Sequence, residues 1–103
     1  MSILVEFAMF PTDKGDSVSP YVSRIIKMMR DSSIPYKLTP MGTVFEVESM
    51  PDALAVISNA YNQLEPDCER VYATSTFDIR KGKSNRIESK IRSVEDKIGK
   101  VSK

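Results

Sequence analysis

The residues whose chemistry most needs explaining are two glutamates on one predicted strand. Residues 39–48 read TPMGTVFEVE, and after the turn residues they alternate so that Glu46 and Glu48 share one side. A core strand seldom carries two carboxylates on one face. We therefore expect this face to bind something, with Glu46 as the functional carboxylate. Simple solvation is the alternative for Glu46 and the preferred interpretation for Glu48.

A few other side chains are candidates for chemistry. Ser17 and Ser19 precede a predicted helix, where free amides and the helix dipole attract polar ligand atoms, although Ser19 alone is also a natural N-cap. Asp78 and Arg80 are spaced as an ion-pair element of a strand. Cys68 has acidic neighbours, which raise a thiol pKa, so we do not expect it to be a nucleophile.

Composition excludes several kinds of site. The chain has no histidine and one cysteine, which rules out Ser-His-Asp and Cys-His catalysis and a zinc constellation. It also lacks the glycine-rich phosphate loops and the basic-Gly-aromatic motif of RNA-binding plaits, so we expect no nucleic-acid partner. Catalysis would have to use carboxylate, lysine, tyrosine or serine chemistry.

Charge and cysteine usage indicate the setting and the kind of ligand. A lone cysteine, no leader pattern at the first residues and no long apolar run predict a soluble, reduced, cytoplasmic protein without a membrane segment. Residues 80–103 hold nine basic and three acidic side chains, whereas residues 1–79 hold six basic and eleven acidic ones. The body of the domain therefore favours a cationic ligand over a polyanion.

The order of predicted elements defines the fold. A strand over 2–10 ends at Pro11, a helix runs from Ser19 to about residue 31, two short strands turn near residues 40–42, a second helix opens at Ser49 and stops at Pro66, and a last strand covers 70–80. This order is that of an α+β, ferredoxin-like βαββαβ plait over residues 1–83, a four-stranded antiparallel sheet with both helices on one face.

The periodicity also assigns faces. The first helix should bury Val22, Ile25, Ile26 and Met29, and the second Leu54, Ile57, Ala60, Tyr61 and Leu64. The sheet face without helices is mixed in character, too polar for a core and too apolar for idle surface. We expect it to bind a ligand or meet another sheet, and it comprises Leu4, Glu6, Val44, Glu46, Glu48, Tyr72, Thr74, Thr76 and Asp78.

Residues 84–103 predict an additional amphipathic helix. Asn85 and Glu88 form a plausible capping pair, and the apolar positions recur at steps of four and three at Ile87, Ile91, Val94, Ile98 and Val101. Burying these side chains stabilises the segment by less than its ordering costs, so the helix must dock. We expect it to pack on a neighbouring subunit; the alternative is that it folds back on its own sheet.

Together, these elements resemble the YkoF-like thiamine-binding family of small plait proteins. The matching segments are the first strand ending in Pro11, the helix entry SVSPYV, YKLTPMGTVFE, and RVYATSTFDIRKGK in the last strand. They span most of residues 3–83, and PMGT followed three residues later by Glu46 is the most specific part. The resemblance implies a homo-oligomer, often a homotetramer, that binds thiamine or its hydroxymethylpyrimidine moiety without altering it and uses no cofactor.

The residues suit such a ligand on physical grounds. Thiamine joins a flat aminopyrimidine to a cationic thiazolium, so it needs apolar or sulfur-bearing walls, a few hydrogen-bonding groups and a negative field. We expect the binding residues to be Phe10 and Met41 as walls, Gly42 for close backbone approach, Thr43, Ser17 and Ser19 as polar groups, and Glu46 as hydrogen-bond partner. Without a phosphate cradle, thiamine should bind better than its diphosphate.

Two other classes of function stay open. A ligand-sensing or protein-interaction module of the regulatory plait type would act through a protein partner and have little affinity for thiamine. A small enzyme would use carboxylates, with Glu46 and Asp78 as the candidates, and would turn over a substrate. The missing histidine and the missing activated nucleophile make the enzyme the weaker of the two.

Overall fold

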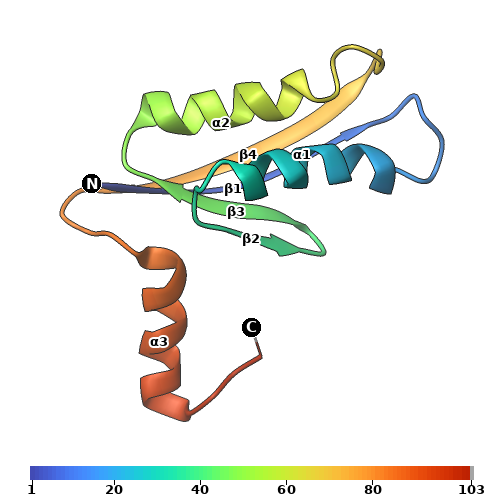
Figure 1. Cartoon of the computed structure of the whole chain (residues 1–103). Helices are drawn as coiled ribbons and strands as arrows, with labels where there is room; N and C mark the ends of the chain where they lie inside the picture. Colours follow the sequence, from blue (N-terminus) through green and yellow to red (C-terminus); the bar gives the residue numbers. More distant parts are fainter. Residues whose placement is uncertain (103) are drawn as a thin grey trace.

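The computed structural model describes residues 1–102 and contains one antiparallel sheet and three helices. The predicted ferredoxin-like α+β plait is confirmed: the sheet order is β2-β3-β1-β4, and α1 and α2 lie on one side of the sheet (Figure 1). The elements in chain order are β1 (Ser2–Pro11), α1 (Ser19–Asp31), β2 (Tyr36–Thr39), β3 (Gly42–Val47), α2 (Met50–Asn62), β4 (Val71–Arg80) and α3 (Arg86–Ile98).

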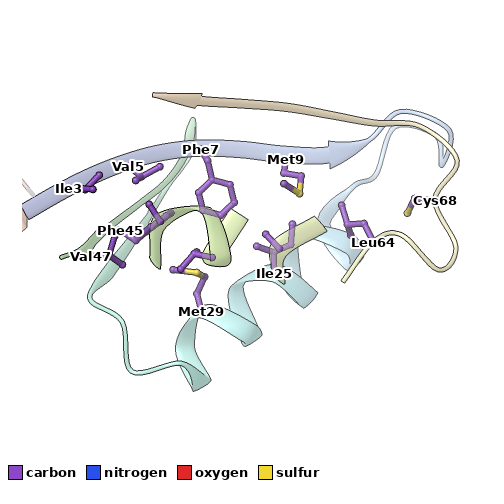
Figure 2. Packing of buried hydrophobic residues seen from close by; sticks show 13 residues of the cluster. Ile3, Val5, Phe7, Met9, Ile25, Met29, Phe45, Val47, Leu64 and Cys68 are labelled. Carbon is purple, nitrogen blue, oxygen red and sulfur yellow. The ribbon is translucent and has the colours of Figure 1, made fainter. Parts of the chain in front are cut away.

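The core lies between the sheet and the two helices. Alternate residues of β1 point toward the helices, and Figure 2 shows Phe7 and Met9 in this orientation. Phe7 meets Phe45 of β3 edge to face, with ring centroids 5.7 Å apart, the arrangement that the quadrupoles of two rings favour. Because side chains alternate along a strand, Val44 and Glu46 of β3 lie on the helix-free face, as the sequence predicts.

The buried face of α2 differs from the prediction. The helix and the turn after it bury Ala53, Val56, Ala60 and Leu64, whereas Leu54 and Tyr61 are exposed. Because α2 is apolar around most of its circumference, periodicity alone did not choose the face. Small side chains at 53 and 60 allow the helix backbone to approach the sheet closely, and this decides the orientation.

The helix starts also needed correction. Ser19 lies inside α1, its N-cap position is Val18 and no side chain caps it, so the predicted Ser19 N-cap is wrong. Ser49, in contrast, caps α2 by accepting a hydrogen bond from the amide of Asp52. At α3, Asn85 occupies the N-cap position without a side-chain cap, and the cap comes from another element.

Helix α3 lies on the side of the sheet opposite to α1 and α2 and projects away from it (Figure 1). Its apolar positions become more exposed with distance from the sheet: Ile87 and Ile91 are half-buried, while Val94 is 45% and Ile98 is 73% exposed. The half of α3 next to the sheet is therefore held more firmly than the outer half, which carries Val94 and Ile98.

Candidate functional site

A cavity of about 210 Å³ opens between α1 and the β2–β3 hairpin, and we call it the hairpin cavity. Its walls come from the end of β1, from α1 and from residues 38–43. It brings together four of the seven side chains or backbone positions that the sequence predicted for ligand binding: Phe10, Met41, Gly42 and Thr43.

The hairpin turn is built by one hydroxyl. Thr39 Oγ1 donates to the carbonyl of Gly42 at 2.8 Å and accepts from the amides of Met41 and Gly42, both at 3.2 Å. A side chain at position 42 would place its Cβ 2.8 Å from the Phe7 carbonyl oxygen, so only glycine fits this approach. The turn holds Met41 at the rim, where it is 85% exposed.

The lining of the hairpin cavity is mostly apolar. Phe10 packs against Tyr72 with ring centroids 5.8 Å apart, and two threonines, Thr39 and Thr43, add polar groups to the walls. The remaining wall residues are Phe7, Ala8, Met9, Val18, Val22, Ile25, Ile26, Leu38 and Pro40. No described residue lining the cavity is charged, so the cavity suits a flat, neutral, partly polar group.

The two serines lie outside this cavity. Ser17 is exposed in the loop before α1, and Ser19 borders a separate groove along α1 that also includes Val22, Lys27 and Arg30. Ser19 provides its carbonyl to the Ser23 hydroxyl at 2.8 Å. Of the helix entry, Val18 contributes to the hairpin cavity.

Glu46 is also distant from the hairpin cavity. It lies four residues beyond Gly42 on β3, on the order of 13 Å along an extended strand. Its carboxylate accepts from the Ser2 hydroxyl at 2.6 Å and from the backbone amides of Arg86 at 3.0 Å and Ile87 at 3.2 Å. A carboxylate from β3 thus satisfies the open N–H groups at the start of α3, where the helix dipole also favours negative charge.

Arg86 completes this network. The side chain is only 4% exposed and donates to the Ser2 hydroxyl at 3.0 Å, to the Ser2 carbonyl at 2.8 Å and to the Asp78 carboxylate at 3.0 Å. Asp78 therefore pairs with Arg86, and with Lys90 at 3.7 Å, and the ion pair predicted with Arg80 is not formed among the described residues. We call Ser2, Glu46, Asp78 and Arg86 the α3 latch.

The latch sets the protonation of its carboxylates. Partial burial raises the pKa of Glu46, but the hydrogen bonds from Arg86, Ser2 and Ile87 outweigh it and hold this pKa below its ordinary value. The hydrogen bond from Arg86 likewise lowers the pKa of Asp78. Both groups are therefore ionised near neutral pH.

A second cavity, of about 720 Å³, lies between α2 and the start of α3. Three carboxylate side chains border it, those of Glu46, Glu48 and Asp52, together with apolar walls such as Val47 and Val56. This cavity could not be predicted from the sequence, because its walls come from segments far apart along the chain. Ser2 shares the parity of Leu4 and Glu6 on the helix-free face of β1, and it is nevertheless buried.

Other kinds of site are not supported within residues 1–102. No cluster of three potential metal-ligating side chains occurs there, and no helix of this part is long and apolar enough to cross a membrane. Cys68 is buried; that burial is the main reason why its thiol pKa is raised, which makes it a poor nucleophile.

Comparison with known proteins gives a family. The model of the thiamine-binding protein family matches residues 5–95. A UPF0045 protein of Mycobacterium bovis is 32% identical over 95 residues, covering 92% of this chain and 93% of the relative. A UPF0045 protein of Methanocaldococcus jannaschii is 30% identical over 92 residues, covering 89% and 91%.

Solved structures agree on the architecture. The crystal structure of a hypothetical protein of Methanocaldococcus jannaschii matches with a TM-score of 0.80 at 29% identity, covering 92% of this chain and 97% of that one. A candidate thiamine biosynthesis or salvage protein of Thermotoga maritima matches with a TM-score of 0.78, covering 91% and 99%. At 18% identity, the second match bears on the fold alone.

Proposed function

This chain belongs to the thiamine-binding protein family, and we propose that it binds thiamine through the aminopyrimidine end, in the hairpin cavity, without altering the ligand chemically. The observation that carries the proposal is the meeting of Phe10, Met41, Gly42 and Thr43 around one cavity. Phe10 lies near the end of β1, whereas Met41, Gly42 and Thr43 are consecutive in the β2–β3 hairpin, and the sequence predicts all four as ligand-binding residues.

Size favours the aminopyrimidine over the whole vitamin. At about 210 Å³ the hairpin cavity is smaller than the roughly 300 to 1,000 Å³ typical of drug-sized ligands. A flat ring can lie between Phe10 and the Met41 thioether, where stacking and sulfur–aromatic contacts are favourable. The thiazolium then remains at the rim in the field of the acidic body.

Binding without turnover is the better match to the side chains present. The cavity lining contains neither a carboxylate nor a lysine, so no general acid or base reaches a ligand held there. The residues considered for an enzyme, Glu46 and Asp78, are engaged in the α3 latch.

We further propose a homo-oligomer, because the chain exposes more apolar surface than a small monomer needs. The outer half of α3, with Val94 and Ile98, is the part expected to dock on a neighbouring subunit. Whether this assembly is a dimer or the homotetramer that the resemblance implies is decided by native mass.

Isothermal titration tests the ligand. The hydroxymethylpyrimidine and thiamine should both bind at micromolar concentration or tighter, and thiamine diphosphate more weakly, because no phosphate cradle is present. Met41→Ala should weaken binding of the first two, whereas Leu54→Ala, which removes another exposed apolar side chain, on α2, should not. Absence of heat with all three ligands, or a diphosphate that binds most tightly, would contradict the proposal.

A further inference from the structure

The cavity between α2 and the start of α3 plays no part in the proposed ligand binding, and we call it the α2–α3 cavity. Its volume is about 720 Å³, within the roughly 300 to 1,000 Å³ typical of small-molecule sites. Figure 1 shows the start of β1, the end of β3, the start of α2 and the segment before α3, which all border it, at one end of the sheet. No described residue lines both this cavity and the hairpin cavity, so the two can be occupied independently.

One wall of the α2–α3 cavity is apolar and firmly packed. Val47 of β3 and Val56 of α2 are 8% and 4% exposed and belong to the core cluster. Ile34, Pro35 and Ala55 continue this wall and are more exposed. Because side chains of a close-packed core have little room to move, the wall has a fixed shape. It suits the flat apolar body of a small molecule.

The lining also carries negative charge that the chain itself does not neutralise. Glu48 follows β3, Asp52 lies in the first turn of α2, and both side chains are exposed. Within residues 1–102, neither carboxylate forms a hydrogen bond or an ion pair. No described residue lining the cavity is basic, and the Arg86 guanidinium is engaged by Ser2 and Asp78. The cavity therefore favours a positively charged ligand.

The backbone around the cavity is unusual. Ser33 and Asn85 have φ angles of 64° and 57°, and within residues 1–102 they are the two non-glycine residues in the left-handed region. Both line the α2–α3 cavity, although they belong to different loops. Such conformations cost free energy and concentrate at ligand-binding and active sites. Backbone geometry therefore indicates the same cavity as volume and charge do.

We propose that the α2–α3 cavity is a second small-molecule site, which binds an organic cation with a flat apolar body. An ammonium, amidinium or guanidinium group lies between the carboxylates of Glu48 and Asp52, where charge-assisted hydrogen bonds are strong. The body packs on the wall that contains Val47 and Val56. Glu46 is not the anchor, because the α3 latch uses its carboxylate. The site goes beyond the proposed binding of thiamine and does not depend on it.

Benzamidine and benzamide form a matched pair of probes for this site. They have the same shape, but benzamidine is a cation at neutral pH and benzamide is neutral. In a nuclear magnetic resonance titration of the full chain, benzamidine should shift the amides of Val47, Glu48 and Val56 saturably, and benzamide should bind about tenfold more weakly or worse. Saturating hydroxymethylpyrimidine should change the benzamidine affinity by less than about twofold, since the two cavities are separate. A pyrimidine that does not bind would contradict the proposed function alone.

Substitutions in the lining test the roles of charge and space. The double variant Glu48→Gln, Asp52→Asn keeps the side-chain shapes and should weaken benzamidine binding about tenfold or more. Glu65→Gln removes an exposed carboxylate in the turn after α2, so it controls for net charge and should leave the affinity within about twofold. Ala55→Trp, at an exposed position of α2, should fill the cavity and abolish binding with both carboxylates in place.

The outcomes that would overturn the proposal are equally specific. Benzamidine without saturable binding at millimolar concentration would show that the cavity does not hold an organic cation. Benzamide that binds as tightly as benzamidine, or a double variant that binds like the parent protein, would show that the two carboxylates do not select the ligand. Amide shifts centred outside the lining residues would place the bound cation elsewhere.

Discussion

At its first residue, Gly42, β3 borders an uncharged cavity, and at Glu46 it joins a network of charged groups. The hairpin cavity has exposed apolar walls and a methionine at the rim. In the α3 latch, one carboxylate accepts three hydrogen bonds and a guanidinium is 4% exposed. A carboxylate that stands out in the sequence can therefore have its hydrogen-bonding capacity used by groups of its own chain instead of by a ligand.

Among the substitutions, replacing Arg86 should have the largest effect on the stability of α3 anchoring, and it changes the α3 latch alone. Arg86→Ala loses four contacts, with the Ser2 hydroxyl, the Ser2 carbonyl, the Asp78 carbonyl and the Asp78 carboxylate, which should cost about 2 to 3 kcal/mol of α3 anchoring. Hydrogen exchange of the α3 amides reports this loss directly. The matched control is Arg92→Ala, an exposed arginine on the same helix whose ion pair with Glu88 is 3.9 Å long.

Titration of the Arg86→Ala protein then tests whether the two regions are independent. We expect thiamine affinity to stay within about twofold of the parent protein, because the substituted side chain does not border the hairpin cavity. A tenfold loss of thiamine affinity in this variant would mean that the ligand contacts the latch. The hairpin cavity and the α3 latch would then not be independent.

Glu46→Gln distinguishes the two roles considered for this residue. The sequence predicts a ligand carboxylate, whose loss should weaken binding by roughly 1.5 to 3 kcal/mol and leave the melting temperature without ligand nearly unchanged. The latch predicts the reverse. The free energy of α3 opening measured by hydrogen exchange should fall by about 1 kcal/mol, because the Gln side chain no longer offers a negative charge to the helix amides, and the affinity for thiamine should be unaltered. We expect the second outcome, and calorimetry with hydrogen exchange on one sample decides.

These same residues show which features of the fold and the site could be predicted from the sequence. The element order and the hairpin turn were predictable, because turns and strand periodicity are local signals. Phe10, Met41, Gly42 and Thr43, expected from the family resemblance, line one cavity, and their contact with a ligand stays a prediction. The role of Glu46 was not, since its partners are 44, 40 and 41 residues away in sequence. The face of α2 failed for another reason: an apolar helix has no unique buried side until packing with the sheet chooses it.

Acidification should open the latch and leave the cavity lining unchanged. The pKa values of Glu46 and Asp78 are both lowered in the folded protein, so their contribution to stability is complete above the unfolded value of about 4 and is lost as pH falls through the lower folded values. Amide exchange of α3, corrected for intrinsic rates, should therefore rise below about pH 4 before the sheet unfolds. Simultaneous loss of α3 and the sheet would show that the latch is not a separate unit.

The smallest effect concerns the polar part of the hairpin cavity. Thr43 is 5% exposed and borders the cavity beside Gly42, whereas the Thr39 hydroxyl is engaged in the turn. Thr43→Val keeps the shape and removes one hydroxyl, so pyrimidine affinity should fall by about 1 kcal/mol, roughly fivefold, with little change in unfolding free energy. Thr39→Val should instead destabilise the turn and reduce affinity through the displaced Met41. If Thr43→Val binds as tightly as the parent protein, the ligand does not enter the cavity as far as β3, and its contacts are confined to the rim.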